Sequence, residues 1–530
     1  IVLKADPYAR KAEPFGTASI LFAPAPYPWT DEDYLHHLPN AHKSPMNIYE
    51  VHLGSWKKGL SYRQLGDTLV PYARDMGYTH LELMPLTEYP YDPSWGYQVT
   101  GYFAPTGRYG DPEDLKYLID KAHQAGLGVL MDWVPAHFTR DEYGLAAFDG
   151  GSLYEHPDPR RADMRQWGTL LFDYGRPEVQ SFLISSAVYW LEEYHLDGLR
   201  VDAVSCMLYM DFGRKGGDYL PNIHGGREDL GAISLFKKLS SAVHALPGRK
   251  LLIAEESTAF PMVTNKHGAE SLGFDFKWNM GWMNDMLSYM ELDPIARKWH
   301  HDKLTFSLTY AFSEYYLLPF SHDEVVHGKR SMLNKMPGDY NGKFAQLRLL
   351  YTYLMAHPGK KLTFMGMELG QFIEWRFGES LDWLLLEYPQ HKALQGFVRG
   401  LNWFYKEHPA LWNRDDGWDG FAWCSVDDKD LSVVSFLRRS EEETLLCAFN
   451  FTPVERPAYT MGIPLAGGYA PVFSTNPLPE AGGLYRTRPV PAMGHEYSLT
   501  VPLPPFGGVF FRLEEGVQSS VPSPSEDTVS

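Results

Sequence analysis

The sequence predicts an α/β protein, built on an eight-stranded (β/α)8 TIM-type barrel that is followed by a C-terminal antiparallel β-domain. From about residue 47 to about residue 408, short apolar segments alternate with longer helical patterns, as is typical of parallel strands joined by crossover helices. This alternation fits a closed barrel or a doubly wound sheet, and the presence of eight strand segments favours the barrel. After about residue 417, alternating polar and apolar runs between Pro and Gly turns indicate a separate antiparallel domain.

The eight strand segments are expected at residues 48–53, 80–84, 128–134, 198–204, 251–256, 274–278, 316–321 and 362–364. Helical patterns between them lie at residues 65–76, 112–125, 177–193, 230–246, 344–356 and 392–406. Two of these helices open with Pro112 and Pro177, and a first helical position tolerates proline well. The segment 136–176 is too long for a plain connection, so we expect an excursion that faces the substrate.

The chain is expected to divide into four parts. Residues 1–45 are Pro-rich, hold a few strand-like pieces such as 19–22, and are too few to fold alone. Residues 46–416 are expected to form the barrel and residues 417–515 the β-domain, with strands at 432–437, 444–450 and 509–513. Residues 516–530 are rich in Ser and Pro without periodicity, which predicts a disordered tail.

Composition and charge exclude several classes of protein. A hydrophobic content of 44% and a charged content of 22% argue against fibrous and wholly disordered chains. The formal charge of −18 disfavours nucleic acid and anionic membranes, and no run of 18 apolar residues predicts a membrane span. Three scattered cysteines (Cys206, Cys424 and Cys447) indicate neither a disulfide framework nor a thiolate metal site, so we expect a cytoplasmic protein, and a monomer. The chain begins at Ile1 rather than Met, which leaves a removed leader open.

The first chemical motif is GLRVDAV at residues 198–204. Arg200 and Asp202 stand two residues apart on a predicted strand, so their side chains project to the same face, which in a barrel is the interior mouth. A guanidinium beside a carboxylate favours the ionised form that an attacking nucleophile requires near neutral pH. A purely structural Arg–Asp pair is the simpler interpretation of this motif when it is taken alone.

Acidic residues also end three other predicted strands. Glu255 follows an apolar run, which predicts a raised proton affinity and a role as general acid and then base. His322 and Asp323 end another strand, and Asp132 with His137 ends a third, although each could be a solvated loop charge. Because the carboxyl ends of barrel strands meet at one mouth, the set together predicts an active site there.

Two nearby carboxylates with flanking hydrogen-bond donors match the chemistry of glycoside bonds. One carboxylate forms a covalent glycosyl-enzyme and the other moves the proton. If the anomeric configuration is retained, we expect the carboxyl groups of Asp202 and Glu255 to lie about 5–5.5 Å apart.

Four segments resemble, in order, the signature regions of the α-amylase superfamily: DWVPAHF, GLRVDAVSCML, LLIAEEST and FSHDEVVHGKRSML. The last of them, with SWGYQVTGYFAPTGRYG, is similar to 1,4-α-glucan (glycogen) branching enzymes in particular. IYEVHLGSW, FMGMELGQFIEW and PLPPFGGVFFRL extend the likeness over nearly the whole chain. The resemblance implies Asp202 as nucleophile, Glu255 as acid/base and Asp323 as the residue that grips sugar hydroxyls in the transition state. It also implies that the subsite of the reacting glucose is lined by Tyr97, Asp132, His137, Arg200 and His322.

Tyr97 is expected to stack beneath the ring of that glucose rather than merely to close a loop. Four further residues, Trp95, Gln98, Trp375 and Trp383, are weaker candidates for outer subsites, for which loop packing is the simpler role.

The reaction implied by the resemblance cleaves an internal α-1,4 bond of an α-glucan and transfers the chain to a 6-hydroxyl, forming an α-1,6 branch. A related hydrolase, either debranching or trehalose-releasing, stays open, because the acceptor is chosen by outer subsites that the four motifs do not encode. A catalytically silent relative that only binds carbohydrate is the third alternative. The intact set of Asp202, Glu255 and Asp323 speaks against it, since a pure binder needs no three converging carboxyls.

The sequence departs from the family patterns at two places. Ala136 stands where many α-amylases carry a calcium-binding Asn, and its side chain has no donor atom, so calcium is not expected. No His/Cys cluster indicates another metal, and no cofactor is expected. The opening KADPYARKAEPFGTAS resembles only the end of the N-terminal carbohydrate-binding β-sandwich of branching enzymes. Residues 1–45 are therefore expected to be its remnant in a truncated chain.

Overall fold

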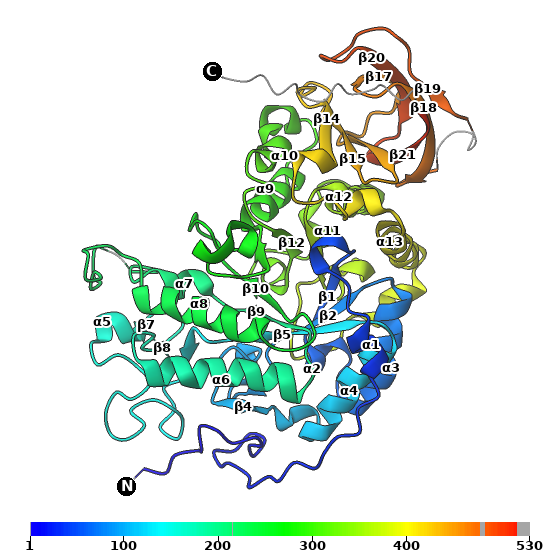
Figure 1. The fold of residues 1–530 in the computed structure, drawn as a ribbon. Coiled ribbons are helices and arrows are strands. Elements are labelled where there is room, and N and C mark those ends of the chain that lie inside the picture. Colours follow the sequence, from blue (N-terminus) through cyan, green and yellow to red (C-terminus); the bar gives the residue numbers. More distant parts are fainter. Residues whose placement is uncertain (1, 215, 478–482, 517–530) are drawn as a thin grey trace.

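The protein is organised around a closed barrel of eight parallel strands (Figure 1), as seen in a computed structural model that describes residues 2–214, 216–477 and 483–516. The strand order around the barrel is β1-β13-β12-β11-β10-β9-β5-β2. Each strand therefore lies beside its sequence neighbour in the barrel, and β13 closes against β1. The predicted barrel is confirmed, and the doubly wound alternative is wrong.

All eight predicted segments contain a barrel strand. The strands are β1 Asn47–Val51, β2 His80–Leu83, β5 Gly128–Trp133, β9 Gly198–Val201, β10 Leu251–Ala254, β11 Phe276–Trp278, β12 Tyr316–Phe320 and β13 Lys360–Phe364. Most predicted segments run one to three residues too far at the carboxyl end. In β9 and β10 the chain leaves the ladder at Val201 and Ala254, so Asp202 and Glu255 stand just past the strands at the mouth.

The helices cover the barrel, and the six predicted ones are present as α3 Tyr62–Asp75, α4 Pro112–Gln124, α6 Pro177–Glu193, α8 Leu230–His244, α12 Tyr340–Ala356 and α13 Pro389–Glu407. Local caps fix their starts: a capping box joins Ser61 and Gln64 at α3. One long helix, α9 Met280–Met290, was not predicted, and the Asn279 side chain caps it by accepting from the Trp282 N–H. Between β10 and β11 the described chain carries only a 3-10 turn, η4 Asn265–Glu270, where a barrel usually has a helix.

Shorter elements complete the barrel part of the chain. They are α1 Glu32–His36, α2 Leu53–Trp56, the pair β3 Thr87–Glu88 and β4 Gly101–Pro105, α7 Val204–Leu208, α10 Asp302–Thr305 and α11 Met332–Lys335. The excursion after β5 holds β6 His137–Phe138, α5 Pro159–Ala162, β7 Asp163–Met164 and β8 Thr169–Leu171, and its strands pair in the order β6-β8-β7.

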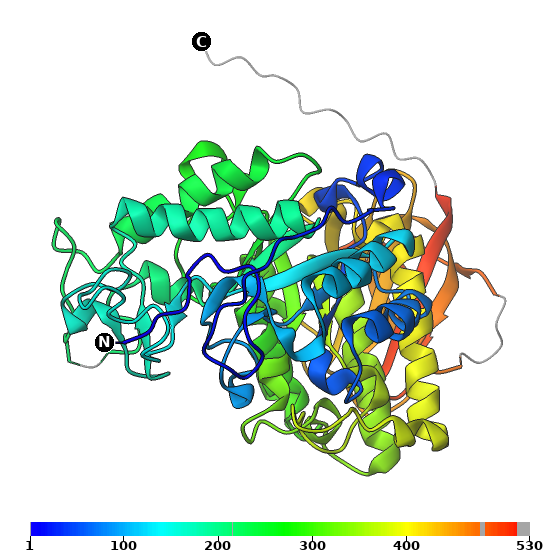
Figure 2. The same cartoon turned by 90° about the horizontal axis from the view of Figure 1, so that it is seen from below.

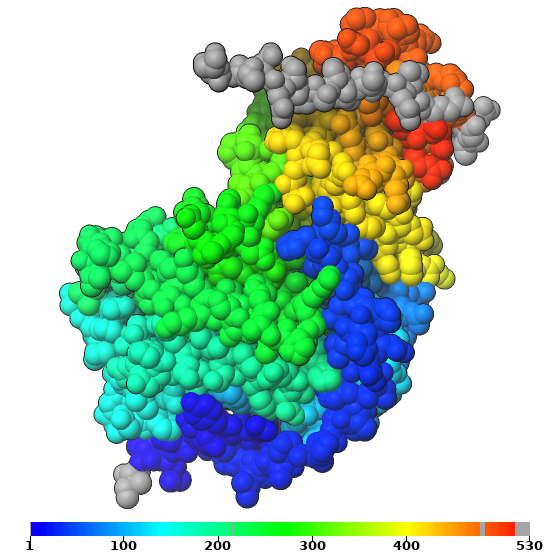
Figure 3. Space-filling view, viewed as in Figure 1, coloured from blue at the N-terminus to red at the C-terminus, as the bar shows by residue number. Residues whose placement is uncertain are grey.

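The C-terminal part forms an antiparallel lobe beside the barrel (Figure 3), as predicted. One sheet has the order β14-β15-β16-β21-β18-β19, with bounds Phe421–Ser425, Val433–Arg439, Thr444–Asn450, Gly507–Gly516, Gly467–Ser474 and Tyr485–Arg486. A second sheet pairs β17 Arg456–Ile463 with β20 Tyr497–Leu503. β21 runs to Gly516, the first residue of the predicted tail, and residues 517–530 lie outside the described residues.

The lobe is anchored to the barrel through α12. Arg438 on β15 is fully buried; its guanidinium donates to the Ala356 carbonyl at the end of α12 and pairs with Asp415. Phe449 and Phe510 from the lobe belong to the same apolar core as the helices of the barrel. The predicted boundary at 416/417 stays a prediction; the first strand of the lobe begins at Phe421.

The N-terminal segment runs along the outside of the barrel (Figure 2). The Ala5 N–H donates to the Tyr143 carbonyl at 2.8 Å, and the Tyr8 ring packs against Phe103, with ring centroids 5.1 Å apart. The expectation of a strand piece at 19–22 is wrong, because Ser19 forms only an isolated bridge with Ala12. The origin of residues 1–45 in a β-sandwich stays a prediction. None of the helices described is both long and apolar enough to cross a membrane.

Candidate active site

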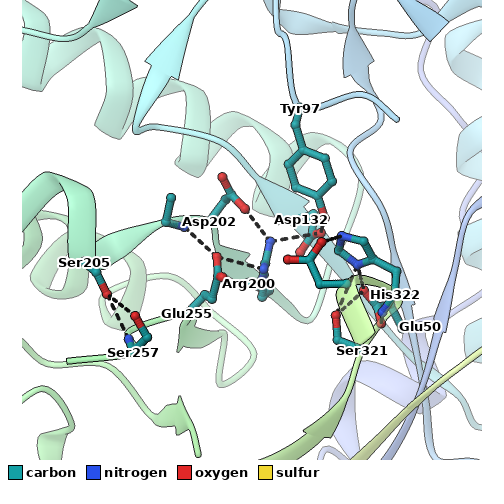
Figure 4. Close-up of polar contacts among 12 residues, drawn as sticks. Glu50, Tyr97, Asp132, Arg200, Asp202, Ser205, Glu255, Ser257, Ser321 and His322 are labelled. Atoms are coloured by element: carbon teal, nitrogen blue, oxygen red, sulfur yellow. Dashed lines mark hydrogen bonds and ion pairs between the residues drawn. The ribbon is translucent and has the colours of Figure 1, made fainter. Parts of the chain in front are cut away.

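The guanidinium of Arg200 is the centre of the polar cluster at the barrel mouth (Figure 4). Its Nη1 lies 2.8 Å from Asp202 Oδ1 and 3.1 Å from Asp132 Oδ2, and its Nη2 lies 2.9 Å from Glu255 Oε2. β9 stands between β5 and β10, and for this reason one side chain on β9 reaches the acidic groups that end both neighbours. The structure thus brings together Arg200, Asp202, Glu255 and Asp132, as the sequence predicted.

Glu255 is held by the chain that follows Asp202. Ala203 adopts a left-handed conformation with φ 53°, which non-glycine residues seldom adopt. Its N–H donates to Glu255 Oε2 at 2.8 Å, and the next N–H, that of Val204, donates to the Glu255 carbonyl at 3.0 Å. The tight turn after β9 therefore fixes one carboxyl relative to the other.

The two adjacent glutamates after β10 have different surroundings. Glu255 contacts Arg200 in the mouth, whereas Glu256 is buried and pairs with Lys277 at 2.6 Å on the outer side of the barrel. Ser205 also donates to Glu256. The geometry therefore favours Glu255, rather than its neighbour, as the residue that meets a substrate.

Tyr97 reaches the cluster from the loop between β3 and β4. Its hydroxyl donates to Asp132 Oδ2 at 2.5 Å, and its ring stacks on the His322 ring at a centroid distance of 5.5 Å. Burial is the main cause that raises the pKa of Asp132 to about 6, with Arg200 opposing the rise. Asp132 is thus the most deeply enclosed carboxyl of the cluster, whereas the carboxyls of Asp202 and Glu255 are 11% and 20% exposed.

His322 and Asp323 follow β12 on the opposite side of the mouth. His322 Nε2 lies 3.5 Å from Asp323 Oδ1, while its Nδ1 lies 2.5 Å from Oε1 of Glu50, a residue of β1. Burial acts to lower the pKa of His322, but the carboxylates of Glu50 and Asp323 outweigh it and raise that pKa to about 9. The side chain of Asp323 is about half exposed (49%), so it is accessible to a substrate.

His137 lies in β6 at the start of the excursion. Burial lowers its pKa to about 4, so its ring is neutral at pH 7. The ring of Trp167, from the turn before β8, lies 4.9 Å from it and is 38% exposed. The excursion after β5 therefore places a partly exposed aromatic ring against His137.

The four weaker candidates occupy different places. Trp95 packs 4.9 Å from Trp375 and 5.7 Å from His322, directly behind the cluster. Trp383 lies elsewhere, and its indole N–H donates to the Trp56 carbonyl. Gln98 is half-buried near Tyr97, and no polar contact joins it to another described residue. Packing accounts for the positions of Trp375 and Trp383.

The carboxyl of Asp202 is subject to opposing influences. Burial raises its pKa well above its usual range, Arg200 acts to lower it, and the carboxylates of Glu255, Asp132 and Asp323 act to raise it. The expected contact with Arg200 is present, and the guanidinium acts in the expected direction, toward the ionised form, although burial outweighs it.

In the described part of the chain, no group of three or more His, Cys, Asp or Glu is arranged to hold a metal ion. Ala136 is fully buried, and its carbonyl accepts a hydrogen bond from the Tyr174 hydroxyl at 2.6 Å. The absence of metals and cofactors stays a prediction.

Sequence reasoning missed three residues near the site. Glu50 and Glu82 are charged residues inside apolar strands, and they are neighbours in the register of β1 and β2. A charge in the middle of a fully buried strand is a usable signal, because such a group needs a specific partner. Trp167 gave no signal, since one Trp in an irregular segment has many possible roles.

The fold and the mouth cluster define a class, the barrel enzymes of the α-amylase type. The family model described as the alpha amylase catalytic domain matches residues 67–152, and that of the alpha amylase C-terminal all-beta domain matches residues 423–514. An alpha-amylase of Geobacillus thermoleovorans superposes with a TM-score of 0.66 at 16% identity, covering 88% of this chain and 98% of the other. At that identity the likeness concerns the fold alone.

Relatives with similar sequences identify one family within this class. The 1,4-alpha-glucan branching enzyme of Cellvibrio japonicus is 50% identical, over 97% of this chain and 72% of the relative. The enzyme of the same name from Methylobacillus flagellatus is 52% identical, over 97% of this chain and 73% of the relative. The chain belongs to the family of 1,4-alpha-glucan branching enzymes.

Proposed function

We propose that this chain cleaves α-1,4-glucan chains and transfers them to a 6-hydroxyl, forming α-1,6 branches, with Asp202 and Glu255 as the reacting carboxyls. Branching activity follows from the family to which the chain belongs. The observation that carries the assignment of residues is the Arg200 guanidinium, which contacts both carboxyls at 2.8 and 2.9 Å. The pair is thereby fixed at the mouth where barrel enzymes act.

In the first step, the Asp202 carboxylate attacks the anomeric carbon of an internal α-1,4 bond. Glu255 gives its proton to the departing 4-oxygen, so the shortened glucan leaves and the transferred chain stays on Asp202 as an ester. In the second step the 6-hydroxyl of another glucan attacks the same carbon, and Glu255 takes its proton. Two inversions give net retention, and the product is an α-1,6 branch.

The remaining residues of the cluster are proposed to bind the reacting glucose. Asp132, Tyr97 and His137 line one side of the mouth, and His322 and Asp323 the other. We assign to Asp323 the grip on sugar hydroxyls that strengthens as positive charge develops at the anomeric carbon. Tyr97 is assigned a stacking role; Trp95 and Gln98 are proposed at the rim of this subsite.

Before the first step, Asp202 must be the anion and the proton must reside on Glu255. Burial raises the pKa of Asp202 and so works against this arrangement, whereas Arg200 acts to lower that pKa. Arg200 bridges both groups and favours the anionic partner, and the Ala203 N–H stabilises negative charge on Glu255 after the proton has left. A separation of about 5–5.5 Å between the carboxyls belongs to this proposal.

Amylose tests the proposal directly. The protein is incubated with amylose while iodine absorbance, reducing ends and the ends released by a later debranching treatment are followed. Branching predicts falling iodine colour, constant reducing ends and many newly released ends. A steady rise of reducing ends would mean hydrolysis and contradict the proposal, as would free trehalose. Asp202→Asn serves as the matched inactive variant.

We also propose that the protein is a monomer of the cytoplasm, with domains at 46–416 and 417–515. All three of its cysteines are free and buried, as is usual for proteins of reducing compartments. Light scattering of the purified protein tests the monomer, and fractionation of cells tests the location. A dimer mass, or recovery outside the cytoplasm, would contradict this part of the proposal.

A further inference from the structure

Glu50 is a fully buried carboxyl in the middle of β1, 272 residues away from its partner along the chain. Its Oε1 lies 2.5 Å from His322 Nδ1, and its Oε2 accepts from the His322 backbone N–H at 3.0 Å. Its Oε1 also accepts from the Ser321 hydroxyl at 3.5 Å. A buried carboxylate is costly unless it is paired and hydrogen-bonded, and here its hydrogen bonds come from the two residues that follow β12.

The contacts of Glu50 determine where the other ring nitrogen of His322 points. With Nδ1 held by Glu50, Nε2 lies on the opposite edge of the ring, 3.5 Å from Asp323. The ring is packed between Tyr97 and Trp375, whose centroids lie 5.5 and 6.3 Å away. Ring position and ring orientation are therefore both fixed before any substrate arrives.

Two other buried histidines show how burial alone changes the pKa of an imidazole in this protein. His137, on the other side of the mouth, is equally buried but has no carboxylate partner, and burial lowers its pKa to about 4. His52 shows the same effect, with burial lowering its pKa to about 3. For His322 burial acts in the same direction, yet Glu50 and Asp323 raise the pKa to about 9. Burial alone thus leaves His137 and His52 neutral at pH 7, whereas His322 is held as an imidazolium.

Other titratable groups also face His322 from the surrounding elements. They are Asp323 from the turn after β12, Arg200 from β9, Asp132 from β5 and His52 after β1, which is neutral at pH 7. Arg200 opposes the charge on the ring. Asp323 is half exposed and 3.5 Å away, while Glu50 is enclosed and 2.5 Å away, so Glu50 is the stronger of the two partners.

We propose that Glu50 is a positioning residue for the transfer reaction, which fixes the His322 ring with both nitrogens protonated so that Nε2–H faces Asp323 and the hydroxyls of the reacting glucose. No covalent bond forms or breaks in this role. The Nδ1–H donates a hydrogen bond to Glu50, and the Nε2–H donates one to a sugar hydroxyl oxygen or to Asp323. The role rests on the proposed branching function, since it acts on the same glucose.

Glu82 provides a matched control. It is fully buried on β2 beside Glu50, and its carboxyl oxygens have no hydrogen-bond partner among the described residues. Burial, with Asp132 and Glu50 adding to it, raises the pKa of Glu82 well above its usual range, which favours the neutral form. Glu82→Gln therefore replaces a carboxyl that has no hydrogen-bond partner among the described residues with an amide of the same shape, in the same layer of the barrel.

The first experiment compares Glu50→Gln with Glu82→Gln in the amylose branching assay. Glu50→Gln is expected to lower kcat by about 10- to 100-fold with little change in KM, the range observed when a carboxylate behind a metal-ligating histidine is removed. Glu82→Gln is expected to keep kcat within about twofold. In a His322→Gln background, Glu50→Gln is expected to add no further loss, because it acts through His322. A tenfold additional loss there, or full kcat in Glu50→Gln alone, would overturn the proposal.

The second experiment measures the protonation state of the His322 ring by NMR. In protein labelled with ¹⁵N-histidine, the His322 nitrogens, assigned by their disappearance in His322→Gln, are expected to show an imidazolium at pH 7 in the unmodified protein and a neutral ring in Glu50→Gln. A neutral His322 at pH 7 in the unmodified protein would overturn the proposal even if Glu50→Gln failed to fold. A wild-type protein that does not branch amylose would refute the proposed function instead, while this spectrum would still decide the Glu50–His322 pair.

Discussion

Replacing Arg200 with Gln removes a guanidinium that faces three carboxylates at distances of 2.8, 2.9 and 3.1 Å. Breaking a buried ion pair by removing one partner costs about 3–5 kcal/mol, because a buried charge is left uncompensated. We expect that loss of unfolding free energy at pH 8. We also expect kcat to fall by about 10²–10³-fold, as when one preorganised electrostatic group is deleted.

The loss of unfolding free energy in Arg200→Gln is expected to depend on pH, because the carboxyl groups around Arg200 titrate. The pKa of Asp132 is raised to about 6 and that of Asp202 is raised as well, so the folded protein binds protons that the unfolded chain releases near pH 4. Such groups cost stability as pH rises from their unfolded-state pKa to their folded-state pKa. Arg200→Gln raises the folded-state pKa values again, so the loss relative to wild type is expected to be smaller at pH 5 than at pH 8.

Thermal and urea unfolding at pH 5 and pH 8, together with kcat on amylose, measure both effects. Arg200→Lys is the control, since one ammonium keeps the charge but cannot bridge three carboxylates, and it should give an intermediate result. An equal loss of stability at the two pH values, or a fall in kcat of less than tenfold, would refute the reasoning.

Three further predictions concern single side chains. Tyr97→Phe leaves the buried Asp132 without its 2.5 Å hydrogen bond and should lower kcat/KM on amylose by about tenfold. An unchanged kcat/KM would show that this hydrogen bond has no role in the reaction. Trp167→Ala should raise KM for long glucans by about 2- to 10-fold while the thermal midpoint stays constant, because the ring is partly exposed; binding isotherms with maltooligosaccharides check this. For His123, burial lowers the pKa, but Asp197 outweighs it and raises the value to about 9. Its contribution to stability should therefore be complete below pH 6.5 and vanish as pH passes 9, so unfolding curves of His123→Gln and wild type should converge at high pH.

The barrel could be predicted from the sequence because its strands are short apolar runs that are buried on both faces. β5, for example, is buried at every residue from Gly128 to Trp133. Strand ends were placed too late where a polar residue of the mouth follows directly, as at Asp202, since the apolar pattern does not mark the point at which pairing stops. Helix α9 was missed because its start is marked only by Asn279, without a proline.

The candidate site could be predicted as a set of residues but not as a network. The motifs placed Arg200, Asp202 and Glu255 at strand ends, and topology alone then brings them to one mouth. The Glu50–His322 contact joins β1 to the end of β12, which are separated in the barrel by β13. No local pattern encodes a contact between such distant positions. The effect of Arg200 on the pKa of Asp202 could be predicted from their spacing, but the larger opposing effect of burial could not, because it depends on how the mouth is packed.

The central claim is that a glucan chain is carried on Asp202. A 5-fluoro α-glucosyl fluoride slows the second step of a retaining enzyme, so the glycosyl ester accumulates and peptide mass spectrometry locates it. The account predicts a glycosyl adduct on the peptide that contains Asp202, formed in wild type and in Glu82→Gln but absent in Asp202→Asn. An adduct on another residue, or branching of amylose by Asp202→Asn at the wild-type rate, would contradict it.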